Sequence, residues 1–308
     1  MVSYDKEQAF EDARPQLLGV AYRLLGTLAE AEDAVQDTAC KWFAATDSLP
    51  DNATAWLTSV CTNRCLDILR SVQRKRTDYV GPWLPEQFQM EADDNAEVQM
   101  EIASSLTTAF LLLLERLSPR ERAAYLLHDI FGEPFSEVAG TLGLSVEHCR
   151  KLASRARQMI SREKVRFVPS QERQNELLDM FRTALATGDA GPLAATLSAD
   201  VDLRADSNGM VTAIQHVLAG RDAVVAFVEQ VMSEVPSDLQ FGLVRANGQA
   251  SLLIRHREKP QALVSFAFAE TGEIQSIYIL RNPDKLERFV STSLTTDGAG
   301  LKKPGSLH

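Results

Sequence analysis

The stretch PFSEVAGTLGLSVEHCRKLASRARQMI, residues 134–160, predicts two helices joined by a tight turn. Ala139 is small enough for two helices to cross closely, and Gly143 can adopt the left-handed conformation of such a turn. Ser145 is a favourable cap for the second helix. The apolar residues fall at spacings that point inward from both helices: Val138, Leu142, Leu144, Cys149 and Leu152. This pattern is typical of a helix-turn-helix.

The outer face of the second helix carries the residue types that contact DNA. Small side chains let a helix approach the floor of a groove, and Arg and Lys bind base edges and phosphates. The residues expected to contact DNA are Ser145, Val146, His148, Arg150, Lys151, Ser154 and Arg155. A helical hairpin with a solvated basic face is the alternative, but the alanine, glycine and apolar positions all agree with DNA binding.

The charge of the chain is distributed unevenly. All 308 residues together carry a formal charge of −10. Residues 116–167 instead hold 10 Lys and Arg against 6 Asp and Glu, and most of these basic residues lie between Arg150 and Arg166. A local basic stripe is the electrostatic feature that a nucleic-acid-binding protein needs, whatever its total charge.

The length and composition are those of a globular protein with two or three domains. No apolar run approaches the ~18 residues of a membrane span, and the N-terminus has no hydrophobic signal core, so a cytoplasmic location is expected. The cysteines show no CxxC pair and no spacing with histidine that is typical of zinc. We therefore expect no metal and no cofactor.

Residues 1–80 predict a second helical unit with two surface signatures. The segment AEAEDAVQDTACKWF (29–43) places Asp33, Gln36 and Asp37 on an acidic, polar helix face. The segment AWLTSVCTNRCLDILRSVQRKR (55–76) combines aromatic, amide and basic side chains, which together can hold unstacked single-stranded bases. Its candidate residues are Trp56, Asn63, Arg64, Arg70, Arg74, Lys75 and Arg76.

The rest of the chain divides where the pattern changes. Residues 81–100 begin with prolines, continue with acids and predict a solvated linker; residues 101–168, which contain the helix-turn-helix, follow. Within them Ser118-Pro119-Arg120-Glu121 is a helix start. Residues 169–290 predict an α+β domain with an initial helix and a mainly antiparallel sheet. The polar tail, residues 291–308, is expected to be disordered.

Residues 8–166 closely resemble the bacterial extracytoplasmic-function (ECF) sigma factors of RNA polymerase. The similar segments are RLLGTLAEAEDAVQDT, AWLTSVCTNRCLDILR and LSPRERAAYLLHDIFGEPFSEVAGTLGLSVEHCRKLASRAR. The resemblance implies two all-α sigma domains, region 2 (residues 1–80) and region 4 (residues 101–168).

The same resemblance implies roles for the candidate residues. Asp33, Gln36 and Asp37 would contact core RNA polymerase. Asn63, with the loop 47–54, would hold a flipped base of the −10 element, and extruding such a base costs energy that the pocket must recover. Trp56 and the basic residues from Arg64 to Arg76 would bind the −10 DNA, while the outer face of the second helix-turn-helix helix would read the −35 element.

The continuation past residue 170 resembles a SnoaL-like (nuclear-transport-factor-2-like) cone and narrows the similarity to a subgroup with such a fused domain. WLPEQF (83–88) stands where the subgroup typically shows WLPEP, and NPDKL (282–286) follows the last expected strand. A third segment, usually DGGGK, reads DSNGM at 206–210, so its lysine is lost. In the subgroup the fused domain is thought to regulate the sigma domains without a separate anti-sigma factor. The residues expected in this regulatory contact are Trp83, Leu84, Pro85, Asp206, Asn282, Pro283, Asp284, Lys285 and Leu286.

Two other functions remain as alternatives. One is a free-standing helix-turn-helix regulator with a small-molecule-sensing C-terminal domain, which would bind promoter duplex without polymerase. The other is an enzymatic cone, which needs an acid or histidine in an apolar pocket. Its candidates by residue type are Asp206, His216, His256 and Tyr278.

Tyr278 is expected to pack in the sheet and His256 to be solvated, so we expect no enzyme. The expected partners are core RNA polymerase and promoter DNA. A small-molecule ligand of the cone is left open.

Overall fold

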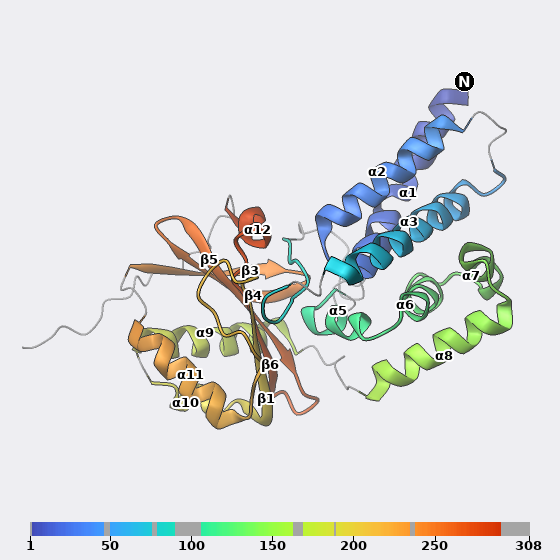
Figure 1. Cartoon of the computed structure of the whole chain (residues 1–308). Coiled ribbons are helices and arrows are strands. Elements are labelled where there is room, and N and C mark those ends of the chain that lie inside the picture. Colours follow the sequence, from blue (N-terminus) through green and yellow to red (C-terminus); the bar gives the residue numbers. More distant parts are fainter. Residues whose placement is uncertain are drawn as a thin grey trace, which may run out of the picture. The chain divides into compact units, whose positions relative to one another are not determined.

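The computed structural model describes residues 2–45, 50–75, 79–89, 106–162, 169–187, 189–234 and 238–290. The chain forms two compact units (Figure 1). The helical unit comprises Met1–Asp78 and Leu111–Glu163, and the sheet unit comprises Tyr79–Phe110 and Lys164–His308. The expected linker, as far as it is described, therefore belongs to the sheet unit. The tail for which we predict disorder lies outside the described residues.

Amphipathic helices build the helical unit by packing their apolar faces together. Helices α1, α2 and α3 contact one another, and Leu17, Leu24 and Leu57 are completely buried. Gly26 has a φ of 78°, the left-handed conformation that lets the chain turn between α1 and α2. The helices in chain order are α1 (Val2–Leu25), α2 (Leu28–Ala44), α3 (Ala53–Lys75), α5 (Thr108–Glu115), α6 (Pro119–Tyr125), η2 (Leu126–Ile130), α7 (Phe135–Leu142) and α8 (Val146–Arg162).

Local signals set the helix ends around the helix-turn-helix. Ser118 and Glu121 form the expected capping box at the start of α6, where the backbone N of Ser118 donates to Oε2 of Glu121 at 3.1 Å. Helix α6 continues into the π-helical turn η2, which the sequence patterns did not predict. Gly143 ends α7 with a φ of 63°, and Oγ of Ser145 accepts a hydrogen bond from the backbone N of His148 at 3.2 Å. The helix-turn-helix prediction is confirmed.

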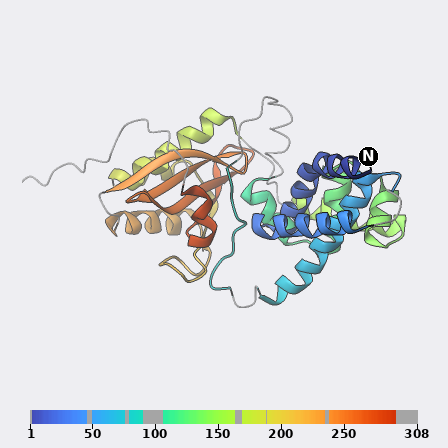
Figure 2. The ribbon, with the colours of Figure 1, turned by 90° about the horizontal axis from the view of Figure 1, so that it is seen from above.

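The sheet unit contains one six-stranded sheet with the strand order β2-β1-β6-β5-β4-β3 (Figures 1 and 2). Neighbouring strands are antiparallel except for β1 and β6, which run parallel, so the mainly antiparallel sheet is confirmed. Strand β2 was not predicted, because two residues are too short to show an alternating pattern. The strands are β1 (Leu197–Asp206), β2 (Leu218–Ala219), β3 (Leu239–Ala246), β4 (Gln249–His256), β5 (Lys259–Phe268) and β6 (Ile274–Leu280).

The two faces of this sheet have different coverings. Helices α9 (Gln171–Thr187), α10 (Gly191–Ala194) and α11 (Arg221–Glu234) lie on one face, where Val264 and Phe266 of β5 join the apolar core (Figures 1 and 2). Ser265 points to the other face because side chains alternate along a strand, and it contacts the linker residue Gln87 there. The elements α12 (Pro283–Leu286) and η3 (Glu287–Phe289) follow β6. None of the helices in the described ranges is long and apolar enough to cross a membrane.

Candidate functional site

Helix α8 exposes the residues that are expected to contact DNA. Six of these seven residues are exposed, and Val146 is half-buried. Cys149 and Leu152, on the other side of the helix, are buried. Lys151 pairs with Glu147 at 2.7 Å, but both side chains are exposed, so the pair contributes little and a DNA phosphate can displace it. Within the helical unit this basic face is therefore accessible to a duplex. We call the seven residues the recognition face.

Asn63, the predicted −10 residue, is engaged by the first helix of the helix-turn-helix. Its Nδ2 donates to the carbonyl oxygen of Thr141 in α7 at 3.0 Å and to that of Ser59 in α3 at 2.9 Å. These two bonds can use both hydrogens of the amide group. A base that accepts a hydrogen bond from Nδ2 would therefore have to displace the carbonyl oxygen of Thr141 or of Ser59.

The predicted polymerase-binding face of α2 includes an ion pair with α3. Asp33 and Gln36 are exposed, while Oδ2 of Asp37 accepts a hydrogen bond from Nε of Arg64 at 2.6 Å. Both charged side chains are about half exposed, so the pair adds little stability. The structure thus joins a residue predicted for polymerase binding to one predicted for −10 DNA. Sequence spacing did not reveal this pair because the two residues lie on different helices.

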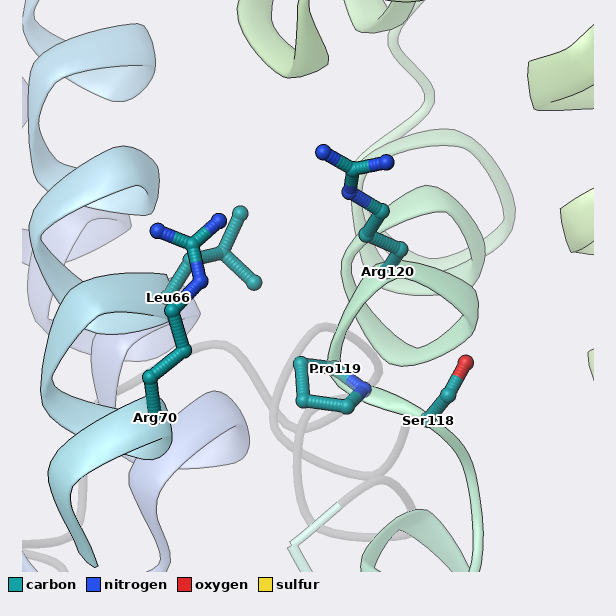
Figure 3. A pocket seen from close by; sticks show the side chains of 5 residues that line it. All are labelled: Leu66, Arg70, Ser118, Pro119 and Arg120. Atoms are coloured by element: carbon teal, nitrogen blue, oxygen red, sulfur yellow. The ribbon is translucent and has the colours of Figure 1, made fainter.

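The remaining predicted −10 residues lie along α3. The ring of Trp56 is 5.4 Å from that of the buried Trp42, so Trp56 has a packing role at the start of the helix. Arg70 and Arg120, from α3 and α6, reach toward one cavity of about 340 Å³ (Figure 3). Leu66, Ser118 and Pro119 complete its lining. The side chains of Arg74 and Lys75, and the whole of Arg76, lie outside the described residues.

Two buried arginines join the segments of the helical unit, and the sequence analysis did not single them out. NH1 of Arg122 in α6 donates to the carbonyl oxygen of Leu24 at 2.5 Å and to Oε1 of Glu115 at 3.0 Å. Arg23 of α1 lies 5.3 Å from the ring centre of Phe131, and burial lowers its pKa to about 10. The signal that could have found Arg122 is its place directly before the apolar run AAYLL.

Asp206, at the end of β1, is completely buried and holds the linker. Its Oδ1 accepts a hydrogen bond from Oη of Tyr79 at 2.5 Å. Its Oδ2 accepts from the backbone N of Leu84 at 2.8 Å and from Nζ of Lys285 at 2.7 Å. A buried carboxylate is stable only when it is paired and hydrogen-bonded, so the acid and its three donors depend on one another. We call Tyr79, Leu84, Asp206, Asn282 and Lys285 the Asp206 cluster.

Lys285 contacts the linker at further points. Its Nζ donates to the carbonyl oxygen of Leu84 at 2.6 Å and lies 4.6 Å from the ring centre of Trp83. A desolvated cation over an indole ring stabilises by about 2 kcal/mol. Trp83 and Leu84 therefore meet Lys285 within the sheet unit, and Leu84 and Lys285 form the hydrogen bonds. The regulatory role expected for this contact stays a prediction.

Asn282 links the Asp206 cluster to Tyr79, a residue that the sequence analysis missed. Nδ2 of Asn282 donates to Oη of Tyr79 at 3.0 Å, and Oδ1 of Asn282 caps α12 by accepting from the backbone N of Asp284 at 3.1 Å. The pKa of Tyr79 is raised, mainly by burial and secondly by the hydrogen bond to Asp206. The hydroxyl of Tyr79 therefore stays protonated and acts as a donor. Of the other predicted residues, two are buried (Pro85 and Leu286) and two are exposed (Pro283 and Asp284).

Residues 84–87 are buried, which corrects the expectation of a solvated linker for this part, while residues 90–100, with most of the acids on which it rested, lie outside the described residues. The next residue, Phe88, exchanges two hydrogen bonds with Asn247: its N donates to Oδ1 at 3.1 Å, and its carbonyl oxygen accepts from N at 3.0 Å. Nε of Arg288 donates to Oε1 of Glu86 at 2.9 Å. Composition alone suggested solvation, whereas the sheet unit supplies partners for these polar groups.

The turn that replaces DGGGK packs against the linker through its glycine. Gly209 has a φ of 69°, and a Cβ at this position would lie 3.2 Å from Val80. Asn208 has a φ of 49°, a conformation that asparagine tolerates. Met210, where the lysine is missing, is exposed. Lys285 supplies a cation to Asp206 from a different segment, so the loss of the lysine does not leave the buried acid without a positive partner.

The helix-covered face of the sheet lines a cavity of about 600 Å³, which bears on the enzymatic alternative. Of the four candidate catalytic residues, His256 lines the cavity, and its Nε2 lies 3.0 Å from Oδ2 of Asp238. His256 is half-buried, with 30% of its side chain exposed, so the expectation that it is solvated holds in part. His216 is exposed, and Asp206 belongs to the cluster described above. Tyr278 is buried, which raises its pKa to about 12 and agrees with a packing role.

Comparison with known proteins gives matches over both units. The Sigma-70 region 2 family model matches residues 9–75, and the Sigma-70, region 4 family model matches residues 107–160. The chain is 33% identical over 288 residues to the ECF RNA polymerase sigma factor SigJ of Mycobacterium tuberculosis, covering 90% of this chain and 91% of the relative. It is 30% identical over 250 residues to the probable ECF RNA polymerase sigma factor SigI of the same species, covering 74% and 86%. The crystal structure of the M. tuberculosis SigJ matches with a TM-score of 0.70 at 31% identity, covering 93% of this chain and 98% of that one.

Two sigma regions with an exposed basic recognition face define a transcription initiation factor of the sigma-70 class. The chain belongs to the ECF RNA polymerase sigma factors and is of the SigJ type, with a C-terminal SnoaL-like domain. It directs transcription initiation, and a protein of this family binds core RNA polymerase and promoter DNA. These matches do not favour the free-standing regulator.

Proposed function

We propose that the sheet unit controls the sigma activity of the helical unit by holding residues 79–89. The observation that carries this proposal is the buried Asp206 carboxylate, with donors from the linker and from Lys285. The eleven residues 79–89, if fully extended, would span at most about 40 Å. While residues 79–89 are docked on the sheet unit, they cannot provide this span between regions 2 and 4.

A covalent tether makes this control effective. Because both partners belong to one chain, their contacts form at effective concentrations of about millimolar, and even weak contacts can bias the arrangement. The fused unit thus takes the place of a separate anti-sigma factor. Core RNA polymerase acts in the bacterial cytoplasm, where we place the protein, and we assign no catalytic reaction to the cone.

In the active state, Asp33, Gln36 and Asp37 contact core RNA polymerase. Asn63 and its basic neighbours on α3 hold the −10 element, and the recognition face reads the −35 element. The exposed acids of α2 and the exposed cations of α8 support this assignment. Because the amide of Asn63 is bound to Thr141, the assignment requires α7 to move away from α3.

The test is run-off transcription with bacterial core RNA polymerase and templates from the gene's own upstream region. The Asp206→Asn substitution removes the charge that holds Lys285 and the linker, so we expect several-fold more transcript than from the unaltered chain. Asp200→Asn is the matched control, since this carboxylate is exposed, lies on the same strand and is outside the Asp206 cluster. A chain ending at Arg166 gives the activity without the sheet unit.

Hydrogen exchange of residues 79–89 tells whether the linker is released in the Asp206→Asn variant. If exchange rises and the transcript does not change, control by linker docking is wrong. A similar gain of transcript from Asp200→Asn would show that the effect does not come from the Asp206 cluster.

A further inference from the structure

The cavity of the sheet unit has a polar end and an apolar remainder. Its volume of about 600 Å³ is within the range of small-molecule sites, roughly 300–1,000 Å³. Apolar side chains of α9, α11 and the strands form most of its wall. Its polar side chains include Gln261, near the start of β5, and His256 and Arg281, at the ends of β4 and β6. The strand register places these three residues at the same end of the sheet.

Arg281 gives this polar end a positive charge. Its NH1 donates to the carbonyl oxygen of Thr212, which also lines the cavity, and it forms no ion pair with a carboxylate in the described ranges. Burial lowers the pKa of Arg281, which is the direction expected for a cation without an acidic partner. Asp238, the acid beside His256, already has two basic neighbours, at 3.0 Å from His256 and 3.8 Å from Arg257.

We propose that this cavity binds a small molecule with an apolar body and one carboxylate, and that Arg281 binds the carboxylate. A guanidinium group presents parallel N–H donors that match a carboxylate in two hydrogen bonds. The apolar wall accepts the body of the ligand.

The cavity and the Asp206 cluster share one strand, so such a ligand acts directly on the cluster. Ala205 lines the cavity, whereas Asp206, the next residue, faces the linker. The backbone N of Arg281 donates to the carbonyl oxygen of Asp206 at 2.7 Å, and Asn282 follows with its bond to Tyr79. This regulatory consequence rests on the function proposed above, but the binding itself does not.

The experiment is calorimetric titration of the full chain with decanoate below its micelle concentration, and with decan-1-ol as the neutral match. We expect saturable binding of decanoate and at least about tenfold weaker binding of the alcohol, the effect of losing a hydrogen bond to a charged group. Arg281→Gln should weaken decanoate binding by a similar factor. Arg245→Gln, an exposed arginine on β3, is the matched control and should bind decanoate unchanged.

A second variant covers the case in which Arg281→Gln does not fold. Ala213→Phe places a ring in the cavity from the loop after β1 and should abolish binding with Arg281 intact. Three results would overturn the site. They are no saturable binding of decanoate, equal binding of decanoate and decan-1-ol, and unchanged decanoate binding in both Arg281→Gln and Ala213→Phe.

Transcription separates this inference from the proposed function. If decanoate binds as expected but neither decanoate nor Asp206→Asn changes the transcript, the site stands and the proposed control fails. If Asp206→Asn changes the transcript and decanoate does not bind, the proposed control stands and the site is overturned.

Discussion

At the scale of single residues, Gly209 sets how closely the linker approaches the turn after β1. Its positive φ costs a residue with a side chain about 1–2 kcal/mol, and a Cβ would also press on Val80 at 3.2 Å. We expect Gly209→Ala to lower the free energy of unfolding by about 1–2 kcal/mol and to raise hydrogen exchange at residues 79–84. Urea unfolding and exchange measurements check both effects.

Gly220 provides the matched control for this prediction. Its φ is also positive, at 91°, but a Cβ there would meet nothing within 4 Å. Gly220→Ala should therefore cost only the backbone strain, less than Gly209→Ala, and leave exchange of the linker unchanged. Equal increases of linker exchange in both variants would show that the contact with Val80 is not responsible.

Glu133 makes the stability of the helical unit depend on pH. Burial raises the pKa of Glu133 from 4.5 to about 7, and the negative charge of Glu137 is the second, smaller cause. Between about pH 4.5 and 7 the unfolded chain loses this proton before the folded protein does, so the free energy of unfolding falls as pH rises and then stays level. Glu133→Gln should remove this part of the decline, as measured by urea unfolding at pH 5 and pH 8.

The comparison for Glu133 is Glu147→Gln, which alters an exposed acid on α8. This variant should keep the decline of the unaltered protein. The same flattening in both variants would mean that the effect is one of total charge and not of the half-buried Glu133 carboxyl.

At the scale of elements, the capping box decides where α6 begins. Ser118 and Glu121 satisfy two backbone N–H groups that the first turn would otherwise leave without partners. Ser118→Ala should therefore lower the free energy of unfolding by about 1 kcal/mol. Ser136→Ala, at an exposed position in the first turn of α7, is the control and should cost less. Equal losses in thermal or urea unfolding would rule out the cap as the cause.

Strand β1 is the element that relates two sites in the sheet unit. Its alternation sends Ala205 into the cavity and Asp206 to the linker. Neighbouring residues on one strand thereby serve two faces with different chemistry. A shift of one residue in register would exchange them, which is why the pairing of β1 with β6 matters to both sites.

At the scale of the whole molecule, the proposed promoter contacts of Asn63 require the helical unit to open. Asn63→Asp replaces the donor to Thr141 with a carboxylate that faces carbonyl oxygens. We expect several-fold faster hydrogen exchange in α7 and, because the base contact is lost as well, less transcript. Asp67→Asn, at an exposed position on the same helix, is the control. Unchanged exchange in α7 would show that Asn63 does not hold this helix.

Much of the architecture was predictable because it is local. The helix-turn-helix, the capping box at Ser118 and the helix from Gln171 follow from spacing and cap residues within one or two turns. The meeting of linker residues 83–85 with residues 282–286 was expected from the resemblance to a family. The pairs Asp37–Arg64 and Asn63–Thr141 were not predictable, since each joins residues whose distance depends on how helices pack.

The sequence by itself determined that this protein is a sigma factor with a fused cone domain, because the sigma regions and the strands follow from short-range patterns and recognisable segments. Only the tertiary structure decided what each polar residue does. The resemblance named Asp206 for a regulatory contact but not its partners, and it became the centre of the linker contact because a buried carboxylate is stable only with hydrogen-bond donors around it. Burial depends on every element that surrounds a residue, and no stretch of sequence contains that information alone.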